Sequence, residues 1–221
     1  MTVQTLLQSA LLKFGQDPSN QRFTDDFYSA LNDAQNDFAT NRSWGFLRTS
    51  SSLSTTADTR HVALPSDFGK AYDTRGALRI TSPSANSGDK IELMPYEQWL
   101  ASFYEDGTDT GTPIYAWTSG ANLYLSPVPD ATYTIALQYY KVPTEIADTS
   151  TAITVPTVYS EALKKMLWRR LQDAGYSSAQ ELAISDADIQ RLLGQCARDD
   201  VRKYGGMNIS LSPSDYKQRL V

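Results

Sequence analysis

TPIYAWTSGANLYLSPVPDATYTIALQYYKVP, residues 112–143, contains three strand-like runs separated by turns. In the last run, residues 133–140, the side chains alternate between a mostly apolar face and a more polar one. Pro127 and Pro129 separate the second and third runs, because each proline fixes φ and removes a backbone hydrogen-bond donor. The three runs predict a β-meander, in which consecutive antiparallel strands pair, as the core of a β domain.

Aromatic residues are concentrated in this stretch. Tyr and Trp are enriched in cores and at interfaces, where a large ring packs and its polar atom finds a partner. We therefore expect core or subunit-interface positions for Tyr115, Trp117, Tyr124, Tyr133 and Tyr139. Alternatively, a row of rings on one sheet face could stack against sugars, and the row would comprise Tyr115, Trp117, Tyr124, Tyr139 and Tyr140.

Helical patterns flank the β region on both sides, with apolar residues repeating at a period near 3.6. Four helices are expected, over residues 2–14, 24–41, 156–175 and 178–204. Thr2 and Thr24 are the expected starts of the first two, and Ser177 or Ser178 caps the last, with Glu181 completing a capping box. Neither terminal pair can bury its apolar stripe alone, so the two pairs should pack together.

Between these helices the apolar pattern changes to a period of two. Further strands are expected over residues 47–53, 60–64, 76–80 and 90–93, the last two forming a hairpin. The first of these is rich in Ser and Thr, which is typical of a solvated edge strand. Pro95 lies near the first turn of a short helix expected over residues 95–103.

The predicted fold class is α+β. A four-helix bundle made from both chain ends carries an inserted antiparallel β domain, sandwich or barrel-like, and an extended C-terminal arm. The expected boundaries are 1–45 for the first helix pair, 46–155 for the β domain, 156–204 for the second pair and 205–221 for the arm.

The composition is that of an ordinary globular chain of 221 residues, 41% apolar and 20% charged, with a net charge of −5. Residues 61–150 hold eleven acids and five bases, whereas residues 151–204 hold seven acids and eight bases. An acidic β region argues against tight DNA binding, because nucleic-acid binders carry a basic stripe. The single cysteine excludes an intramolecular disulfide and fits synthesis in a reducing cytoplasm.

Residues with catalytic or metal-binding potential are few. His61 is the only histidine, and no second metal-type ligand lies near it in sequence. Cys196 falls on the apolar stripe of the last helix, where a small buried hydrophobe is expected. Glu105, Asp106 and Asp109 share a loop that lacks the full series of calcium ligands. No phosphate-binding glycine motif occurs, so we expect no enzyme, cofactor or metal site.

Two segments have chemistry suited to protein–protein contacts. A basic run on the third expected helix could meet the acidic β region of a neighbouring copy, although a solvated helix face is the alternative. This run comprises Lys164, Lys165, Arg169 and Arg170. The arm has no helical stripe, and its alternating pattern suits addition to the sheet edge of a portal or neighbouring subunit. Its expected contact residues are Met207, Ile209, Leu211, Tyr216, Lys217, Arg219 and Leu220.

A series of turn and aromatic residues runs through the β region in a fixed order. It comprises Trp117, Gly120, Leu123-Tyr124-Leu125, Pro127-x-Pro129-Asp130, Tyr133, Tyr139-Tyr140 and Pro143, preceded by Leu64-Pro65-Ser66-Asp67-Phe68. With the flanking helices, this layout resembles the tailed-phage head-to-tail adaptors, also called tail accessory factors or tubular adaptors. The resemblance extends over most of the chain.

The resemblance implies a structural virion protein, made in the cytoplasm of a host bacterium, at the head–tail junction. It implies a ring of twelve copies that joins the portal to a tail or nozzle protein, with DNA passing through the channel without specific binding. It also implies that the helices lie near the portal and channel and the β domain lies outside or below.

The alternative function is a carbohydrate-binding β-sandwich module of a phage tail fibre or baseplate. That function would explain the aromatic residues of the β region. It would not explain why helices flank the β region on both sides.

Overall fold

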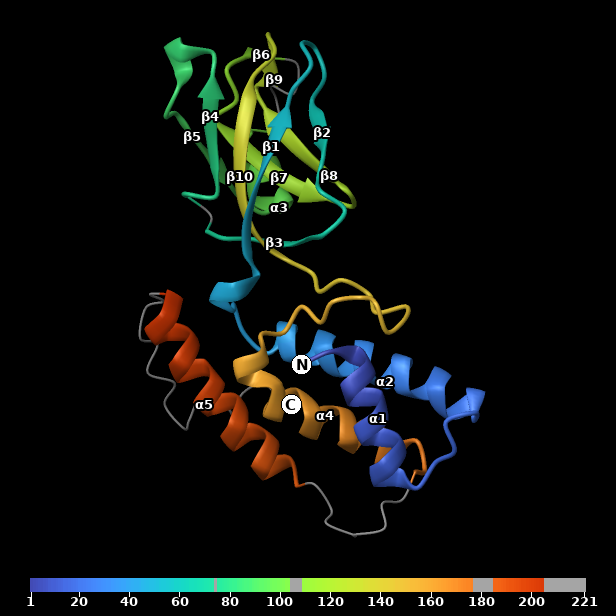
Figure 1. Cartoon of the computed structure of the whole chain (residues 1–221). Helices are drawn as coiled ribbons and strands as arrows, with labels where there is room; N and C mark the ends of the chain where they lie inside the picture. The colour runs from blue at the N-terminus through green and yellow to red at the C-terminus, as the bar shows by residue number, and fades with distance from the viewer. Residues whose placement is uncertain (74, 104–108, 177–184, 205–221) are drawn as a thin grey trace. The chain divides into compact units, whose positions relative to one another are not determined.

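The computed structural model describes residues 1–73, 75–103, 109–176 and 185–204. The fold is α+β, and the described residues form five α-helices and a nearly closed, barrel-like sheet (Figure 1). The chain divides into two compact units. The helix unit is Met1–Phe46 together with the chain from Glu145 onward, and the β unit is Leu47–Thr144.

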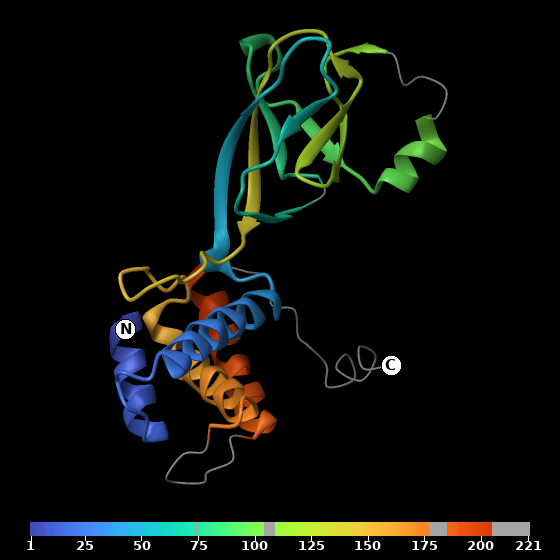
Figure 2. The same ribbon diagram turned by 90° about the vertical axis from the view of Figure 1, so that its right-hand side faces the viewer.

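The helix unit takes its helices from both ends of the chain (Figure 2). They are α1 (Val3–Phe14), α2 (Gln21–Thr40), α4 (Ser160–Asp173) and α5 (Asp186–Tyr204). A short 3₁₀ turn, η3 (Thr157–Tyr159), precedes α4, and another, η1 (Gly45–Leu47), spans the boundary with the β unit. Helix α4 packs against both α2 and α5. The packing of both chain ends into one unit is therefore observed, and a regular four-helix bundle remains a prediction.

Aromatic rings from both chain ends form the centre of the helix unit. Trp44 is fully buried, stacks on Phe38 at 4.6 Å between ring centroids, and donates its Nε1–H to the Phe38 carbonyl at 2.6 Å. The ring of Tyr159, more than a hundred residues later, lies 5.8 Å from Trp44. A side chain at Gly45 would collide with Tyr204, so this close approach requires glycine.

Helix starts follow the local capping chemistry. The side chain of Thr2 accepts the Thr5 N–H at 3.2 Å, as in a capping box. The expected start of the second helix at Thr24 is wrong, because Asn20 caps α2 by accepting the Phe23 N–H at 3.2 Å. The Thr24 hydroxyl instead donates to the Asn20 carbonyl. The caps expected at 177, 178 and 181 lie outside the described residues.

The β unit contains ten strands and one helix within its described residues. They are β1 (Arg48–Ser54), β2 (His61–Ala63), β3 (Phe68–Ala71), β4 (Leu78–Ser82), β5 (Lys90–Leu93), α3 (Tyr96–Phe103), β6 (Thr110–Gly111), β7 (Tyr115–Ser119), β8 (Asn122–Ser126), β9 (Val128–Pro129) and β10 (Thr134–Lys141), with a 3₁₀ turn, η2 (Ser84–Asn86), between β4 and β5. The main sheet has the order β1-β10-β4-β5-β7-β8-β2, and β3 also pairs with β10. The expected hairpin of β4 and β5 and the short helix α3 are both confirmed.

The predicted β-meander is only half correct. Strands β7 and β8 form a hairpin with Trp117 opposite Tyr124, but β10 pairs with β1 and β4. The free edge of β8 is occupied by β2, with His61 opposite Tyr124. Pro127 and Pro129 cannot donate to a ladder, and the segment between β8 and β10 pairs instead with β6.

The expectation of a wholly antiparallel β domain is also wrong. Strands β5 and β7 pair in parallel, as do β6 and β9. Parallel neighbours need a crossover connection, and the chain between β5 and β7, which includes α3, supplies one. The signal for this arrangement was present in the short helix predicted over residues 95–103.

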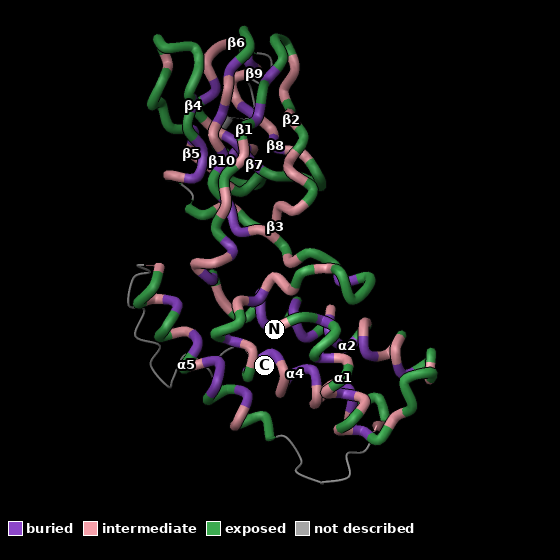
Figure 3. Tube along the Cα trace, in the orientation of Figure 1, coloured by how far each residue is buried: buried purple, intermediate pink, exposed green. Residues whose placement is uncertain are grey.

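The core of the β unit lies inside the curved sheet, as the alternating burial along the strands shows (Figure 3). Ile135, Leu137 and Tyr139 of β10 belong to this core, whereas Gln138 is exposed. The predicted apolar face of this strand is therefore confirmed. Tyr140 lies on the opposite face yet is only 8% exposed, because neighbouring side chains cover it there.

Candidate interaction surfaces

The residues with catalytic potential do not form a reactive site in the described part of the chain. His61 is exposed and lies beside Tyr124, with ring centroids 5.6 Å apart. Cys196 is buried, and desolvation raises the pKa of its thiol to about 11, so the nucleophilic thiolate is disfavoured at neutral pH. Asp109 is exposed, and Glu105 and Asp106 lie outside the described residues.

Among the described residues, no group of three or more His, Cys, Asp or Glu is arranged to hold a metal ion. None of the described helices combines the length and apolar character needed to cross a membrane.

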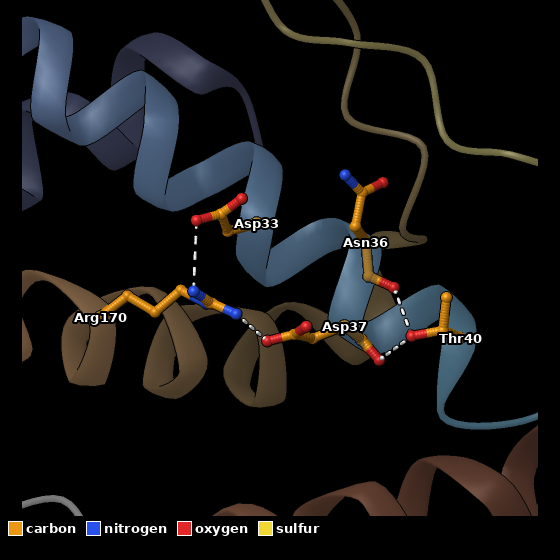
Figure 4. A network of polar contacts seen from close by, with 5 residues as sticks. All are labelled: Asp33, Asn36, Asp37, Thr40 and Arg170. Atoms are coloured by element: carbon orange, nitrogen blue, oxygen red, sulfur yellow. Dashed lines mark hydrogen bonds and ion pairs between the residues drawn. The ribbon is translucent and has the colours of Figure 1, made fainter.

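The four basic residues of α4 do not share one partner. Arg170 reaches α2 of the same chain, where its guanidinium pairs with Asp33 at 3.2 Å and also with Asp37 (Figure 4). Arg169 pairs with Asp173 one turn later at 3.3 Å, and Lys164 and Lys165 are half-buried. Arg170 therefore has a role inside the helix unit, and a contact of this run with a neighbouring copy stays a prediction.

Long-range hydrogen bonds, which the sequence did not predict, also tie the two chain ends together. The side-chain amide of Asn32 donates to the Ile146 carbonyl at 3.0 Å and accepts the Ile146 N–H at 2.8 Å. The hydroxyl of Tyr176 donates to Asp26 at 2.6 Å, and this bond is the main cause of the raised pKa of Tyr176. A polar side chain on a helix gives no sequence signal of a partner more than a hundred residues away.

Of the aromatic residues singled out in the β unit, Tyr133 and Tyr139 are buried with bonded hydroxyls. Tyr133 donates to Asp130 at 2.6 Å, and this bond is the largest of the causes that raise its pKa. Tyr139 donates to Asp67 at 2.6 Å, and burial together with this bond raises its pKa to about 12. Both rings pack in the core cluster, so neither offers a face to a sugar.

The other aromatic rings stack across β7, β8 and α3. The Trp117 ring stacks on the Tyr124 ring, with centroids 5.6 Å apart, and on the Trp99 ring of α3, with centroids 4.4 Å apart. Trp117 is 5% exposed because α3 covers it, and Tyr115 is half-buried. Trp99 is the buried anchor of α3, although no other described residue accepts a hydrogen bond from its Nε1–H. The covered Trp117 ring leaves the sugar-binding alternative without its central platform.

A group of cations and tyrosines on β1, β10 and β3 was missed at the sequence level. Arg48, Tyr140 and Lys70 lie opposite one another across these three strands. The Arg48 guanidinium lies 4.3 Å from the centroid of the Tyr72 ring. Tyr72 directly follows β3 and is two residues from Lys70, a spacing that places both side chains on one face of extended chain. That spacing was the available signal, but β3 itself had not been predicted.

Comparison with known families gives a match over almost the whole chain. The model of the family described as SU10 adaptor protein matches residues 1–210. The chain belongs to this phage head–tail adaptor family. Among curated proteins no match is found.

Membership makes this adaptor a bacteriophage virion component with a structural role. The match includes both units and thereby supports the layout on which the resemblance rested. The arm residues expected to make contacts, 207 to 220, lie outside the described residues.

Proposed function

We infer that the protein forms a ring at the head–tail junction, joins the portal to tail or nozzle components, and lets DNA pass through its channel. The observation that carries this proposal is the family match over residues 1–210. A ring of identical copies needs two different contact surfaces on each subunit, because its interfaces are heterologous and close by rotation. We expect twelve copies.

The helices are the part that we expect near the portal and the channel, arranged as a bundle, with the β unit facing the tail. Lys164 and Lys165 are half-buried on α4 and remain candidates for contact with a neighbouring subunit. Arg170 is a weaker candidate, because Asp33 and Asp37 of its own chain already pair with it.

DNA passage without specific binding agrees with the charge of the chain. The net charge of −5 opposes accumulation of a polyanion at the surface. A protein that neutralises several phosphates shows a steep loss of affinity with added salt. We expect negligible affinity for duplex DNA, and tight, salt-sensitive binding in a titration would contradict passage through a non-binding channel.

Electron microscopy of particles that carry the labelled protein tests the proposal directly. The expected result is a ring of label between the portal and the tail. Label at the fibres or the baseplate would instead support the sugar-binding alternative and overturn the adaptor ring.

Deleting residues 207–221 tests the arm. The truncated chain should keep the melting temperature of the full chain, while its attachment to portal-bearing heads is lost, because the arm is expected to bind a partner rather than its own subunit. Normal head attachment and tail assembly by the truncated protein would refute the arm contact while leaving the ring itself in place.

A further inference from the structure

The main sheet of the β unit ends in two outer strands, β1 and β2, each of which lacks a neighbour on one side within the described residues. The curvature of the sheet brings these two strands close in space, but no ladder of hydrogen bonds joins them. An outer strand presents a row of unpaired N–H and C=O groups, which is a template for a further strand. Strand β1 is the longer template, with seven residues against three in β2.

Half of the backbone groups of β1 point away from the sheet. Directly after β1, the Thr55 N–H donates to the Tyr133 carbonyl at 2.9 Å. Antiparallel ladder bonds recur at every second residue, so the odd-numbered residues of β1 make the bonds to β10. The even-numbered residues therefore direct their N–H and C=O groups outward. They are Ser50, Ser52 and Ser54, and each is exposed.

This edge has none of the features by which outer strands usually avoid pairing. Natural edges are protected by charged side chains, by proline or by a bulge. Residues 49–54 of β1 contain no charge and no proline. The register with β10 runs without a shift from Thr49 opposite Tyr139 to Ser54 opposite Thr134. A regular, uncharged edge of this length suits the addition of a strand.

The core beside this edge has apolar surface that a further strand would cover. Leu53 is buried on the inner face of β1, opposite Ile135 of β10. Val62 of β2 and Leu64 pack against the same core cluster but are only half-buried. A strand added to β1 would extend the inner face if every second side chain were apolar, and its polar side chains would stay outside.

The C-terminal arm contains a segment with this alternation. Residues 207–212 read MNISLS, so an extended chain places Met207, Ile209 and Leu211 on one side and three polar side chains on the other. The segment carries no charge, like the edge of β1. Pro213 ends it, because proline cannot donate to a ladder. Its six residues match the length of the open edge.

We propose that residues 207–212 of one copy add as a strand to the open edge of β1 in a second copy. The arm, residues 205–221, can extend over about 55–60 Å, whereas the twenty residues of α2 span about 30 Å. It can therefore reach beyond its own helix unit. Arm and edge are different surfaces, so each bound copy leaves one of each for the next, and such contacts close into a ring. The proposal rests on the ring proposed above and assigns a contact within it.

Disulfide trapping in the full chain tests the contact. Ser52→Cys and Ser210→Cys are combined in a Cys196→Ala background, and both the purified chain and virions that carry it are oxidised. Neighbouring strands bring such side chains within disulfide reach, so a non-reducing gel should show a ladder of linked chains. The matched control replaces Ser52→Cys with Arg79→Cys, which is exposed on β4 between two paired strands and should give no ladder.

Aspartate substitutions in the arm test the predicted alternation with the same trapping pair. Ile209→Asp with Leu211→Asp puts charges on the side that faces the core and should lower the yield of linked chains by about tenfold or more. Asn208→Asp with Ser212→Asp adds the same charge to the outer side and should leave the yield nearly unchanged. Equal yields from the two double variants would contradict pairing as a strand.

Proline on the edge tests whether the contact depends on the backbone. Ser52→Pro, with the trapping cysteine moved to Ser50→Cys, removes an outward N–H and should lower the yield by about tenfold or more. The ladder to β10 does not use this N–H, so the sheet can retain its bonds and its melting temperature. Ser52→Ala in the same background keeps the backbone and should be trapped normally. Equal yields from Ser52→Pro and Ser52→Ala would refute the backbone contact.

The pattern of linkage also identifies the occupant. A disulfide within one chain, detected as loss of free thiols without a ladder, would show that the arm binds its own edge and would overturn the proposal. Linkage to the portal protein alone, or no linkage in solution and in virions, would overturn it as well. Label at the head–tail junction without a ladder would refute this contact and leave the adaptor ring. A ladder with label elsewhere in the virion would support the contact and refute the proposed location.

Discussion

The helix unit and the β unit differ in the sequence range of the contacts that stabilise each of them internally. The β unit is one continuous stretch, Leu47–Thr144, whose core cluster lies inside its own sheet. The helix unit combines residues from both chain ends, joined by the Trp44–Tyr159 contact and the Asn32–Ile146 bonds. The β unit can therefore fold from one continuous stretch of sequence, whereas the helix unit needs residues from both ends of the chain. Contact order accordingly predicts slower folding for the helix unit than its helical content suggests.

The largest effect is expected when the central ring of the helix unit, Trp44, is removed. Trp44→Ala should lower the stability of that unit by about 3–5 kcal/mol, because a fully buried ring and its hydrogen bond are lost. Calorimetry of the full chain should show one transition moving and the β-unit transition unchanged. Leu137→Ala is the matched variant in the β unit and should move the other transition. A shared shift in both variants would mean that the units unfold as one.

Alkaline pH should destabilise both units through one buried tyrosine each. Burial is the main cause that raises the pKa of Tyr139 in the β unit and of Tyr159 in the helix unit, each to about 12 from 10.0. The folded state holds these protons more tightly than the unfolded chain, so their stabilisation is complete below about pH 10 and is lost as the pH rises through about 12. The loss should be at most about 3 kcal/mol per tyrosine.

Circular dichroism against pH measures this effect. Tyr139→Phe should flatten the alkaline loss of the β-sheet signal and leave that of the helices. An unchanged alkaline profile in Tyr139→Phe would show that other groups control it.

A smaller effect is expected when the Asn32–Ile146 hydrogen bonds between the two chain ends are removed. Asn32→Ala removes both hydrogen bonds to Ile146 and should cost about 1–3 kcal/mol, because the backbone groups of Ile146 lose their partner. Chemical denaturation monitored by helix signal provides the measurement. Asn36→Ala, on the same helix but exposed, is the control. Equal losses of unfolding free energy in the two variants would contradict a specific contribution from the Asn32–Ile146 hydrogen bonds.

The smallest expected effect is that of the ion pairs between α4 and α2. Arg170→Ala should cost about 1 kcal/mol or less at low salt and nearly nothing at high salt, because the side chains of Arg170, Asp33 and Asp37 are 37–55% exposed. Thermal melts at two salt concentrations test it. A loss that persists at high salt would point to packing of the Arg170 stem instead.

Patterns of a single element were predictable from the sequence. The helical stripes, the β4–β5 hairpin and the apolar face of β10 each depend on neighbours within a few residues. The start of α2 was misplaced because Asn20 is a better cap than Thr24, and both precede the same stripe.

Pairings between distant elements were not predictable. Nothing in β10 indicates that its partners are β1 and β4, since any strand with an apolar face would satisfy the same alternation. The cation–tyrosine group on β3 and β10 depends on that pairing, so it could not be assembled from the sequence. The Arg170 pairs with α2 likewise required the packing of α4 first.

The buried Cys196 gives the helix unit an intrinsic chemical reporter. It is the only cysteine of the 221 residues, and it belongs to α5. A thiol reagent can therefore modify the chain at one atom, and only when α5 opens. The rate of modification, followed against reagent concentration, would separate the frequency of opening from its equilibrium constant. The β unit has no thiol and would contribute nothing to that signal. The opening of α5 can therefore be measured in the wild-type chain, without introducing a label site.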